Sequence, residues 1–373
     1  AGGVLPGRKY RGPRGVLPSE EQREADRVFC RFLWQFGLVY AALAFMVMRT
    51  VRLVSLSGQR WFLIGAVAVE IIGAALMVIP VERTLHALFG EDSIVTEQAP
   101  AKINLALLVG EKHPDGYHDV TSVMQSVSLC DTVTARRTSG GITLTCSDPT
   151  LACDETNLAY RAAALFFEET GVEGGAALTL EKVIPMQAGL GGGSSDAAAV
   201  LRALRRLYAP DMPLEELERM AIRLGSDVPY CVRGATTLVE GRGEHLTQLP
   251  ALPACWCVLC KPDIACPTGA MYGEIDRRGA HLTLDVQEMV HALERGDLAA
   301  VCALVGNVFE QVIDPESDIF TIRRRLTELG ADAACMSGSG SAVFGLFTKE
   351  ETARAAQELL SQDYPRTFLA KTV

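Results

Sequence analysis

The sequence has too little positive charge for a protein that binds nucleic acid. Its 35 lysines and arginines are outnumbered by 45 aspartates and glutamates, which gives a formal net charge of −10. No cluster of basic residues is interleaved with aromatic ones, and aromatic residues make up only 6% of the chain. Because nucleic-acid backbones are bound by clustered basic side chains, we exclude nucleic acid as a partner.

The sequence also lacks a regular pattern of cysteines. Its 11 cysteines are an odd number with irregular spacing, which argues against a disulfide framework and favours the reducing cytosol. The run Ala254–Lys261 reads as a buried strand, in which cysteine acts as a small apolar residue. Zinc bound by a closed set of four ligands is the less favoured alternative, so no metal ligand is assigned to the protein. The four candidate ligands are Cys255, Cys257, Cys260 and Cys266.

Neither of the two best-known phosphate-binding loops is present. The chain has no G-x-x-x-x-G-K-[ST] sequence, and no lysine follows its main glycine run. The dinucleotide pattern G-x-G-x-x-G fails as well, because Ser194 occupies the third glycine position after Gly189 and Gly191. What the chain has instead is a glycine-rich stretch that leads directly into alanines, over residues 185–199.

This stretch has the composition of a polyphosphate cradle. Four of the five residues from 189 to 193 are glycine, which lets the backbone approach a ligand closely. A helix is expected from about Ser194 to Tyr208, and its free N–H groups would face an anion. Ser194 and Ser195 suit the N-cap, and their hydroxyls are placed to reach a phosphate or its Mg²⁺. A flexible linker is the alternative, which the immediate start of the helix disfavours.

Two long apolar runs precede this region, and they account for much of the hydrophobic content of 49%. Residues 32–48 carry no charge, and residues 61–80 carry only Glu70. Both runs are long enough, or nearly so, to span a bilayer, and neither has a polar face. The positive-inside rule places the N-terminus and everything after residue 81 in the cytoplasm, anchored in the inner or plasma membrane. Buried core helices are the alternative.

A strand and a loop that follow carry polar residues of functional type. Lys102 and Asn104 lie two residues apart, so a strand presents both on one face. A buried lysine is costly unless it is paired, which favours a functional role. In the turn at 113–119, Tyr117 and His118 are able to stack on a base and hydrogen-bond to it, although surface decoration is an equal alternative.

Residues 185–198 resemble the central motif of the GHMP kinases, P-x-x-x-G-L-G-[GS]-G-S-[SD]-[DN]-A-A. With Pro100–Leu105 and Asp115–His118, they resemble the branch of that family that phosphorylates 4-diphosphocytidyl-2-C-methyl-D-erythritol, in the non-mevalonate route to isoprenoids. The resemblance covers about residues 96–373. One departure is Val308, where an acid commonly follows the asparagine. Three later segments agree with the resemblance: Gly225–Pro229, Lys261–Thr268 with Tyr272, and Met336–Ser341.

The resemblance implies ATP-dependent transfer of a phosphoryl group to the 2-hydroxyl of this small molecule, with Mg²⁺. Asp227 would be the catalytic base, although on spacing alone it is an ordinary turn residue. Lys102 would lie beside it, keep the carboxylate ionised and stabilise the incipient alkoxide. Asn104 and Thr268 would orient the polyol.

The resemblance also implies where the two substrates bind. Tyr117 and Tyr272 would stack on the two faces of cytosine, and His118 would bond its edge. A second glycine loop would close on the site from the C-terminal domain, although a tight turn between strands is the alternative: Ser337, Gly338, Ser339 and Gly340. The ATP phosphates would lie along the first loop: Pro185, Gly189, Leu190, Gly191, Gly192, Gly193, Ser194 and Ser195.

The order of elements predicts an α+β fold. Strands are expected within 99–146, at 176–184 and at 254–261, and helices at 157–170, 194–208 and 213–224. The resemblance implies the GHMP kinase fold. This fold pairs an N-terminal domain like the second domain of ribosomal protein S5, here 96–253, with a ferredoxin-like C-terminal domain, here 254–373. Residues 1–95 form a basic segment with the two predicted membrane helices.

Two other functions are weighed against this one. A GHMP kinase for mevalonate, homoserine or a sugar is disfavoured by Tyr117, His118 and Tyr272, because those substrates carry no base. A membrane-bound nucleotide sensor without turnover is disfavoured by the presence of both Lys102 and Asp227. The sequence does not set the oligomeric state.

Overall fold

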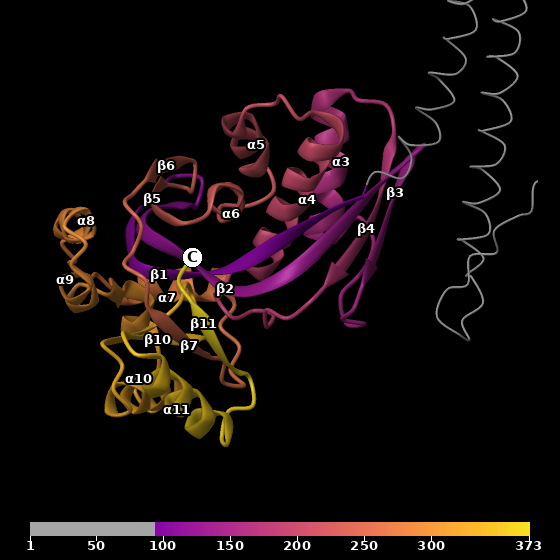
Figure 1. Ribbon diagram of the computed structural model, residues 1–373. Coiled ribbons are helices and arrows are strands. Elements are labelled where there is room, and N and C mark those ends of the chain that lie inside the picture. Colours follow the sequence, from indigo (N-terminus) through magenta and orange to yellow (C-terminus); the bar gives the residue numbers. More distant parts are fainter. Residues whose placement is uncertain (1–93) are drawn as a thin grey trace, which may run out of the picture. The chain divides into compact units, whose positions relative to one another are not determined.

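The computed structural model describes residues 94–373 of the chain (Figure 1). The predicted membrane-spanning segments 32–48 and 61–80 therefore lie outside the described residues. Within residues 94–373, no helix combines the length and apolar character needed to cross a membrane.

A seven-stranded sheet is built mainly from the first half of this region. At its centre β1 (Ile94–Lys112) and β2 (His118–Thr138) pair antiparallel along most of their length. The remaining strands are β3 (Gly141–Cys146), β4 (Gly175–Glu181), β5 (Thr236–Gly241), β6 (His245–Gln248) and β8 (Gly306–Asn307). The strand order is β3–β4–β2–β1–β8, and β5 pairs with both β2 and β6.

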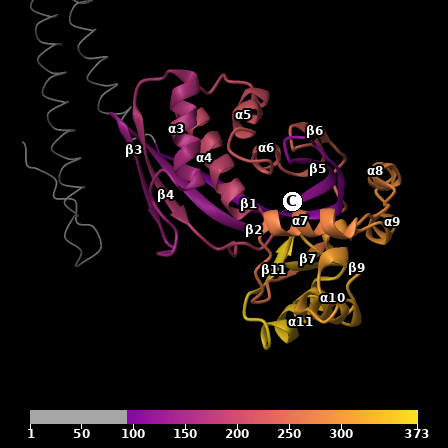
Figure 2. The same cartoon turned by 180° about the vertical axis from the view of Figure 1, so that it is seen from behind.

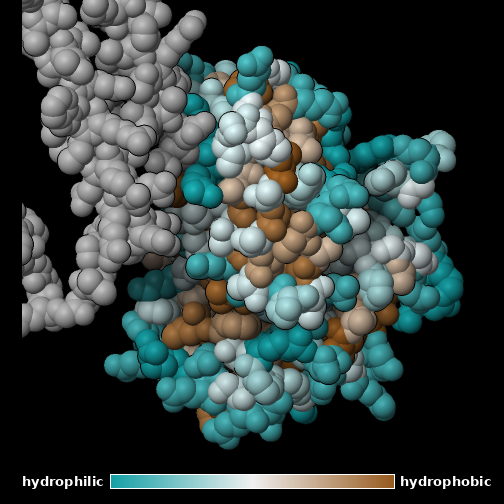
Figure 3. Space-filling view, turned by 90° about the vertical axis from the view of Figure 1, so that its right-hand side faces the viewer, coloured by the Kyte–Doolittle hydropathy of each residue, from teal (hydrophilic) through white to brown (hydrophobic). Residues whose placement is uncertain are grey.

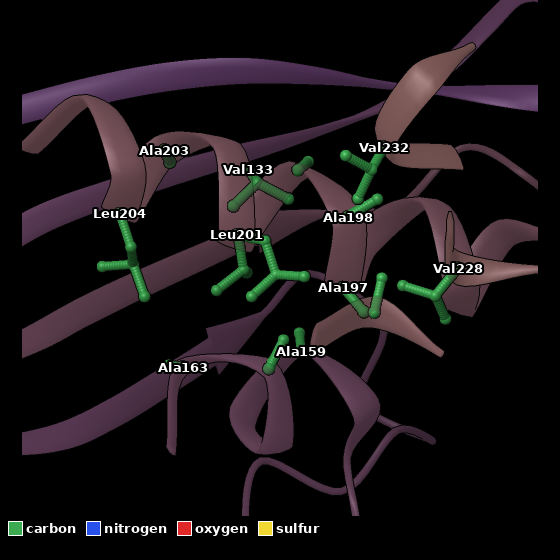
Figure 4. Close-up of a cluster of buried hydrophobic side chains, with 14 of the residues drawn as sticks. Val133, Ala159, Ala163, Ala197, Ala198, Leu201, Ala203, Leu204, Val228 and Val232 are labelled. Carbon is green, nitrogen blue, oxygen red and sulfur yellow. The ribbon is translucent and has the colours of Figure 1, made fainter. Parts of the chain in front are cut away.

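Four helices cover one face of this sheet: α3 (Leu158–Thr170), α4 (Gly192–Tyr208), α5 (Leu214–Ala221) and α6 (Val228–Arg233). Alanines such as Ala159 and Ala197 let the helices pack closely around Leu201, Leu204 and Val133 (Figure 4). The predicted limits of α3 are confirmed by its caps. The Asn157 side chain accepts a hydrogen bond from the Ala159 N–H, and Gly171 ends the helix in a left-handed conformation.

A four-stranded antiparallel sheet forms the second half, in the order β11–β7–β10–β9. Two helices pack on it, α10 (Asp318–Glu328) and α11 (Glu350–Ser361). Viewed from behind, α7 (Thr268–Arg278) runs across the region where the two sheets meet (Figure 2). The other elements are β7 (Trp256–Cys260), β9 (Ala333–Met336), β10 (Val343–Phe347), β11 (Thr367–Lys371), α8 (Val286–Glu294), α9 (Leu298–Ala303) and a 3-10 helix (Val308–Val312).

The cysteine-rich strand is β7, and the prediction that it is buried is confirmed. Cys257 and Cys260 are fully enclosed within it, and Cys255 is buried just before it. Burial raises the pKa of the Cys255 and Cys260 thiols to about 11. Both thiols therefore stay protonated at neutral pH and pack as small apolar groups.

The face shown in Figure 3 carries hydrophilic side chains with smaller apolar groups between them. Across residues 94–373, few large apolar side chains are exposed, which is normal for a globular surface. They are Ile94, Tyr117, Val183, Met186, Leu359 and Val373.

Candidate functional site

A cavity of about 840 Å³ lies where the two sheets meet. It brings together residues from both halves of the chain that the sequence predicts to be functional. Those lining it are Lys102, Asn104, Tyr117, His118, Gly189, Ser194, Asp227, Thr268, Tyr272, Gly338, Ser339 and Gly340. Seven other predicted residues do not line it: Pro185, Leu190, Gly191, Gly192, Gly193, Ser195 and Ser337.

Lys102 and Asp227 form an ion pair in this cavity. The Lys102 Nζ lies 3.6 Å from an Asp227 carboxylate oxygen and donates a hydrogen bond of 2.7 Å to Asn104 Oδ1. Lys102 is 3% exposed, so these two partners offset the cost of burying its charge. Asp227 immediately precedes α6, but its side chain does not cap that helix and is 35% exposed. A hydroxyl that enters the cavity can therefore meet a carboxylate and an ammonium together.

The glycine loop begins α4 earlier than predicted. The helix starts at Gly192, and its N-cap is Gly191, which has a φ of 70°. The prediction that Ser194 and Ser195 form the N-cap is wrong, because a left-handed glycine turns the chain into the helix sooner. A Cβ on Gly191 would lie 2.9 Å from Lys102 Cγ, so glycine is also needed for close packing. Ser195 is buried, and its hydroxyl donates to the Pro100 carbonyl at 2.8 Å.

The C-terminal glycine loop lies directly against the first glycine loop. The Ser337 hydroxyl donates to the Gly189 carbonyl at 2.9 Å, and the Ala342 N–H donates to the Ala188 carbonyl at 3.0 Å. The Gly338 N–H donates to Asn104 Oδ1 at 2.9 Å. The two loops thus form one wall of the cavity, beside the buried lysine.

Asn307 was not assigned a role from the sequence, yet it holds the second loop in place. It is buried at the end of β8, and its Nδ2 donates to the carbonyls of Met336 and Gly338, both at 2.8 Å. Glu310 adds a bond from the Met336 N–H at 2.9 Å. The sequence shows Asn307 as part of a family motif, but the motif does not indicate its partners, because its hydrogen bonds reach a segment about thirty residues further along the chain.

His118 and Tyr272, which also line the cavity, stack on each other. Their ring centroids are 5.1 Å apart, with an interplanar angle of 24°. Tyr117 is 60% exposed, and the Arg242 guanidinium lies over its ring at 5.1 Å. Arg242 also pairs with Asp115 at 2.6 Å, and the backbone N–H of Tyr117 together with this arginine lowers the pKa of the Asp115 carboxyl. The proposed sandwich of a base between the two tyrosines stays a prediction.

A buried charge cluster lies beneath the first glycine loop. Lys182 Nζ donates to carboxylates of both Asp131 and Asp196, the second at 2.6 Å. Asp131 also accepts from the backbone N–H groups of Val183 and Ile184. One Asp196 oxygen is buried with no hydrogen-bond partner. The cluster thus joins β2, the segment before the loop and the N-terminal part of α4.

Asp196 gives the folded protein a pH dependence. Desolvation by burial raises its pKa from 3.8 to about 7. Because the folded state holds this proton more tightly than the unfolded state, the stabilisation is present below pH 3.8 and is lost as the pH rises towards 7. We therefore expect Asp196→Asn to gain stability relative to the parent protein between pH 5 and pH 8. Urea unfolding at pH 5 and pH 8 measures the free energy of unfolding of both proteins. The same difference between variant and parent at both pH values would contradict this role of Asp196.

Comparisons with known proteins identify the relatives of this chain. Residues 157–235 match the family described as GHMP kinases N terminal domain, and residues 289–366 match GHMP kinases C terminal. The 4-diphosphocytidyl-2-C-methyl-D-erythritol kinase of Exiguobacterium sibiricum is 44% identical over 259 residues, covering 69% of this chain and 90% of the relative. The enzyme of that name from Geobacillus kaustophilus is 44% identical over 253 residues, covering 67% and 87%.

Solved structures have the same architecture. A crystal structure of 4-(cytidine 5'-diphospho)-2C-methyl-D-erythritol kinase is similar with a TM-score of 0.64 and 36% identity, covering 74% of this chain and 99% of its own. Homoserine kinase from Cytophaga hutchinsonii gives a TM-score of 0.59 at 18% identity, covering 75% and 94%. The second likeness concerns the fold alone.

Proposed function

The chain belongs to the GHMP kinases and, among them, to the 4-diphosphocytidyl-2-C-methyl-D-erythritol kinases, and from this premise we propose how its residues act. It transfers a phosphoryl group from ATP to the 2-hydroxyl of 4-diphosphocytidyl-2-C-methyl-D-erythritol, a step in making isoprenoid precursors. The observation that carries this function is the Lys102–Asp227 pair, which faces a cavity bounded by both glycine loops.

Asp227 accepts the proton of the attacking hydroxyl in this proposal. Its carboxylate is exposed to the cavity and free of capping bonds, so a substrate hydroxyl can approach it. Lys102 stabilises negative charge on the attacking oxygen, and Asn104 holds the ammonium in place. Asn104 also bonds Gly338 and Ser122, so it acts on the substrate mainly through Lys102. Thr268, whose hydroxyl lies 3.0 Å from that of Ser339, orients the polyol.

The phosphates of ATP fit the first glycine loop and the start of α4. Four N–H groups at a helix N-terminus lack partners within the helix and attract anions. The space around Gly193 is open, since no heavy atom outside its chain neighbours and the adjoining helix backbone lies within 4 Å of the position of a Cβ there. Mg²⁺ is commonly held by phosphates and one or two carboxylates, and it neutralises phosphate charge when bound.

Cytosine is bound between Tyr117 and Tyr272, with His118 at its edge. Three observations support this: both tyrosines line the cavity, His118 lies against Tyr272, and Arg242 is stacked over Tyr117. We assign residues 96–253, which supply six of the seven strands of the first sheet, to the S5-like domain, and residues 254–373, which supply β8 and the second sheet, to the ferredoxin-like domain. A base-free substrate such as mevalonate or homoserine leaves these aromatic groups without a role.

Turnover with defined substrates tests this function. ADP release is measured with 4-diphosphocytidyl-2-C-methyl-D-erythritol, mevalonate and homoserine as acceptors. We expect rapid release with the cytidine substrate and background rates with the other two. Turnover on a different alcohol would overturn the assignment of the cytidine substrate. Binding of ATP with no turnover on any acceptor would favour the nucleotide sensor.

We also propose that residues 32–80 anchor the chain in a membrane, with the kinase in the cytoplasm. The support is the two apolar runs in the sequence and the basic residues before them. We expect the full chain to stay in the membrane pellet after carbonate extraction, and a chain that starts at residue 94 to stay in the supernatant. Complete release of the full chain would contradict the anchor.

A further inference from the structure

His118 is fixed in the cavity by residues from two different elements. It begins β2, directly opposite Lys112 at the end of β1. From α7, Tyr272 stacks on its ring, and the Asp276 carboxylate lies 2.7 Å from its Nε2. Tyr272 and Asp276 are four residues apart, so they lie on one face of that helix. The His118 side chain is buried, and its orientation is set by this single face of α7.

The carboxylate determines which ring nitrogen carries the proton. Lys112 Nζ donates to the second Asp276 oxygen at 2.6 Å. The bonds from Lys112 and then from His118 hold the pKa of the Asp276 carboxyl below its usual value. An ionised carboxylate can only accept hydrogen bonds, so Nε2 of His118 must be the donor. In the neutral ring Nδ1 is then an acceptor.

The Nδ1 atom of His118 is available to a ligand. Within residues 94–373 it makes no hydrogen bond, and it is not one of the unbonded polar atoms that the protein encloses completely. His118 itself lines the cavity, together with Tyr117, Tyr272 and Asp276. An acceptor with fixed orientation therefore lies at the end of the cavity where the base is proposed to bind.

We propose that Asp276, held by Lys112, is a positioning residue that makes the site select cytosine over uracil through His118. This rests on the proposed function. Cytosine carries an amino donor at the position where uracil carries a carbonyl acceptor. Nδ1 accepts a hydrogen bond from the cytosine amino group, whereas uracil would bring two acceptors together. A buried polar group without a partner is strongly penalised, so one fixed tautomer separates two bases of nearly equal size.

Asp276→Asn tests the proposal. An amide can donate a hydrogen bond to Nε2 as well as accept one from it, so the variant no longer fixes which ring nitrogen of His118 carries the proton. Glu274→Gln is the matched control: it makes the same chemical change on the same helix, where Glu274 pairs with Arg277 and Arg278 and does not line the cavity. The readout is kcat/KM for the cytidine substrate divided by kcat/KM for its uridine analogue. We expect Asp276→Asn to lower this ratio at least about tenfold, mainly through KM of the cytidine substrate, and the control to leave it unchanged.

Nitrogen-15 NMR of the histidine ring checks the tautomer separately from activity. We expect the parent protein at pH 8 to show His118 protonated at Nε2, and Asp276→Asn to show a mixture or the other tautomer. A parent ring protonated at Nδ1, or an unchanged base ratio in the variant, would overturn the role of Asp276. Failure of the parent protein to use the cytidine substrate would instead overturn the proposed function, and base selection with it.

Discussion

Asp227→Asn is expected to lower kcat by at least about 10²-fold, the usual range for a positioned acid–base group. Asparagine keeps the shape of the side chain but cannot take the proton of the attacking hydroxyl. Because the Asp227 side chain makes no capping hydrogen bond to α6 and is partly exposed, the change should leave the fold intact. ADP release at saturating cytidine substrate measures kcat, and nucleotide titration shows whether ATP still binds.

Asp263→Asn is the matched control for this experiment. Asp263 is fully exposed, pairs with Arg366 at the surface and does not line the cavity. It should retain the parent kcat. Near-normal turnover by Asp227→Asn would remove this carboxylate from the mechanism and leave Lys102 as the main group that acts on the hydroxyl.

Gly189→Ala is expected to damage both stability and activity. Gly189 has a φ of 74°, and a Cβ there would lie 2.0 Å from the Ser337 carbonyl oxygen, which is backbone and cannot rotate away. The left-handed conformation alone costs a non-glycine residue roughly 1–2 kcal/mol, and relief of the clash must separate the two loops. We expect a melting temperature lower by several degrees and a kcat/KM for ATP lower by at least about tenfold.

Gly140→Ala provides the comparison for Gly189→Ala. Gly140 lies in the turn between β2 and β3, and no heavy atom is within 4 Å of the position of a Cβ there. This variant should match the parent protein in differential scanning fluorimetry and in turnover. A Gly189→Ala protein with parental melting temperature and KM for ATP would mean that the contact between the loops is dispensable.

Local sequence signals predicted the parts of the site that lie within short segments. Lys102 and Asn104 share a face because they are two residues apart on a strand, and Asn157 and Gly171 mark the ends of α3 because caps act over a few residues. The prediction that Ser194 and Ser195 cap the helix was wrong because the cap depends on the surrounding structure. Gly191 adopts a positive φ, and the Ser195 hydroxyl donates a hydrogen bond to the carbonyl of Pro100, 95 residues away.

Residues whose partners lie far away in the sequence were missed. Asp276 meets His118 across 158 residues, and no spacing rule connects a helix in the second half of the chain to a turn in the first. Arg242 and Asn307 are similar cases. Arg242 reaches Asp115 because β5 pairs with β2, and Asn307 reaches Gly338 because the two sheets pack together. Motifs therefore indicate what chemistry is present, and packing determines which groups control it.

The backbone contacts between the two glycine loops restrict how the cleft can open. Ala188 and Gly189 are bonded to Ala342 and Ser337, so the two halves of the molecule are stitched together directly beside the reaction centre. Asp276 joins the two halves at a second place, because its carboxylate meets both Lys112 and His118. Two such attachments restrict rotation of one half against the other. Ligands should accordingly be admitted and released by movement of side chains that neither attachment holds, such as Tyr117, which is 60% exposed.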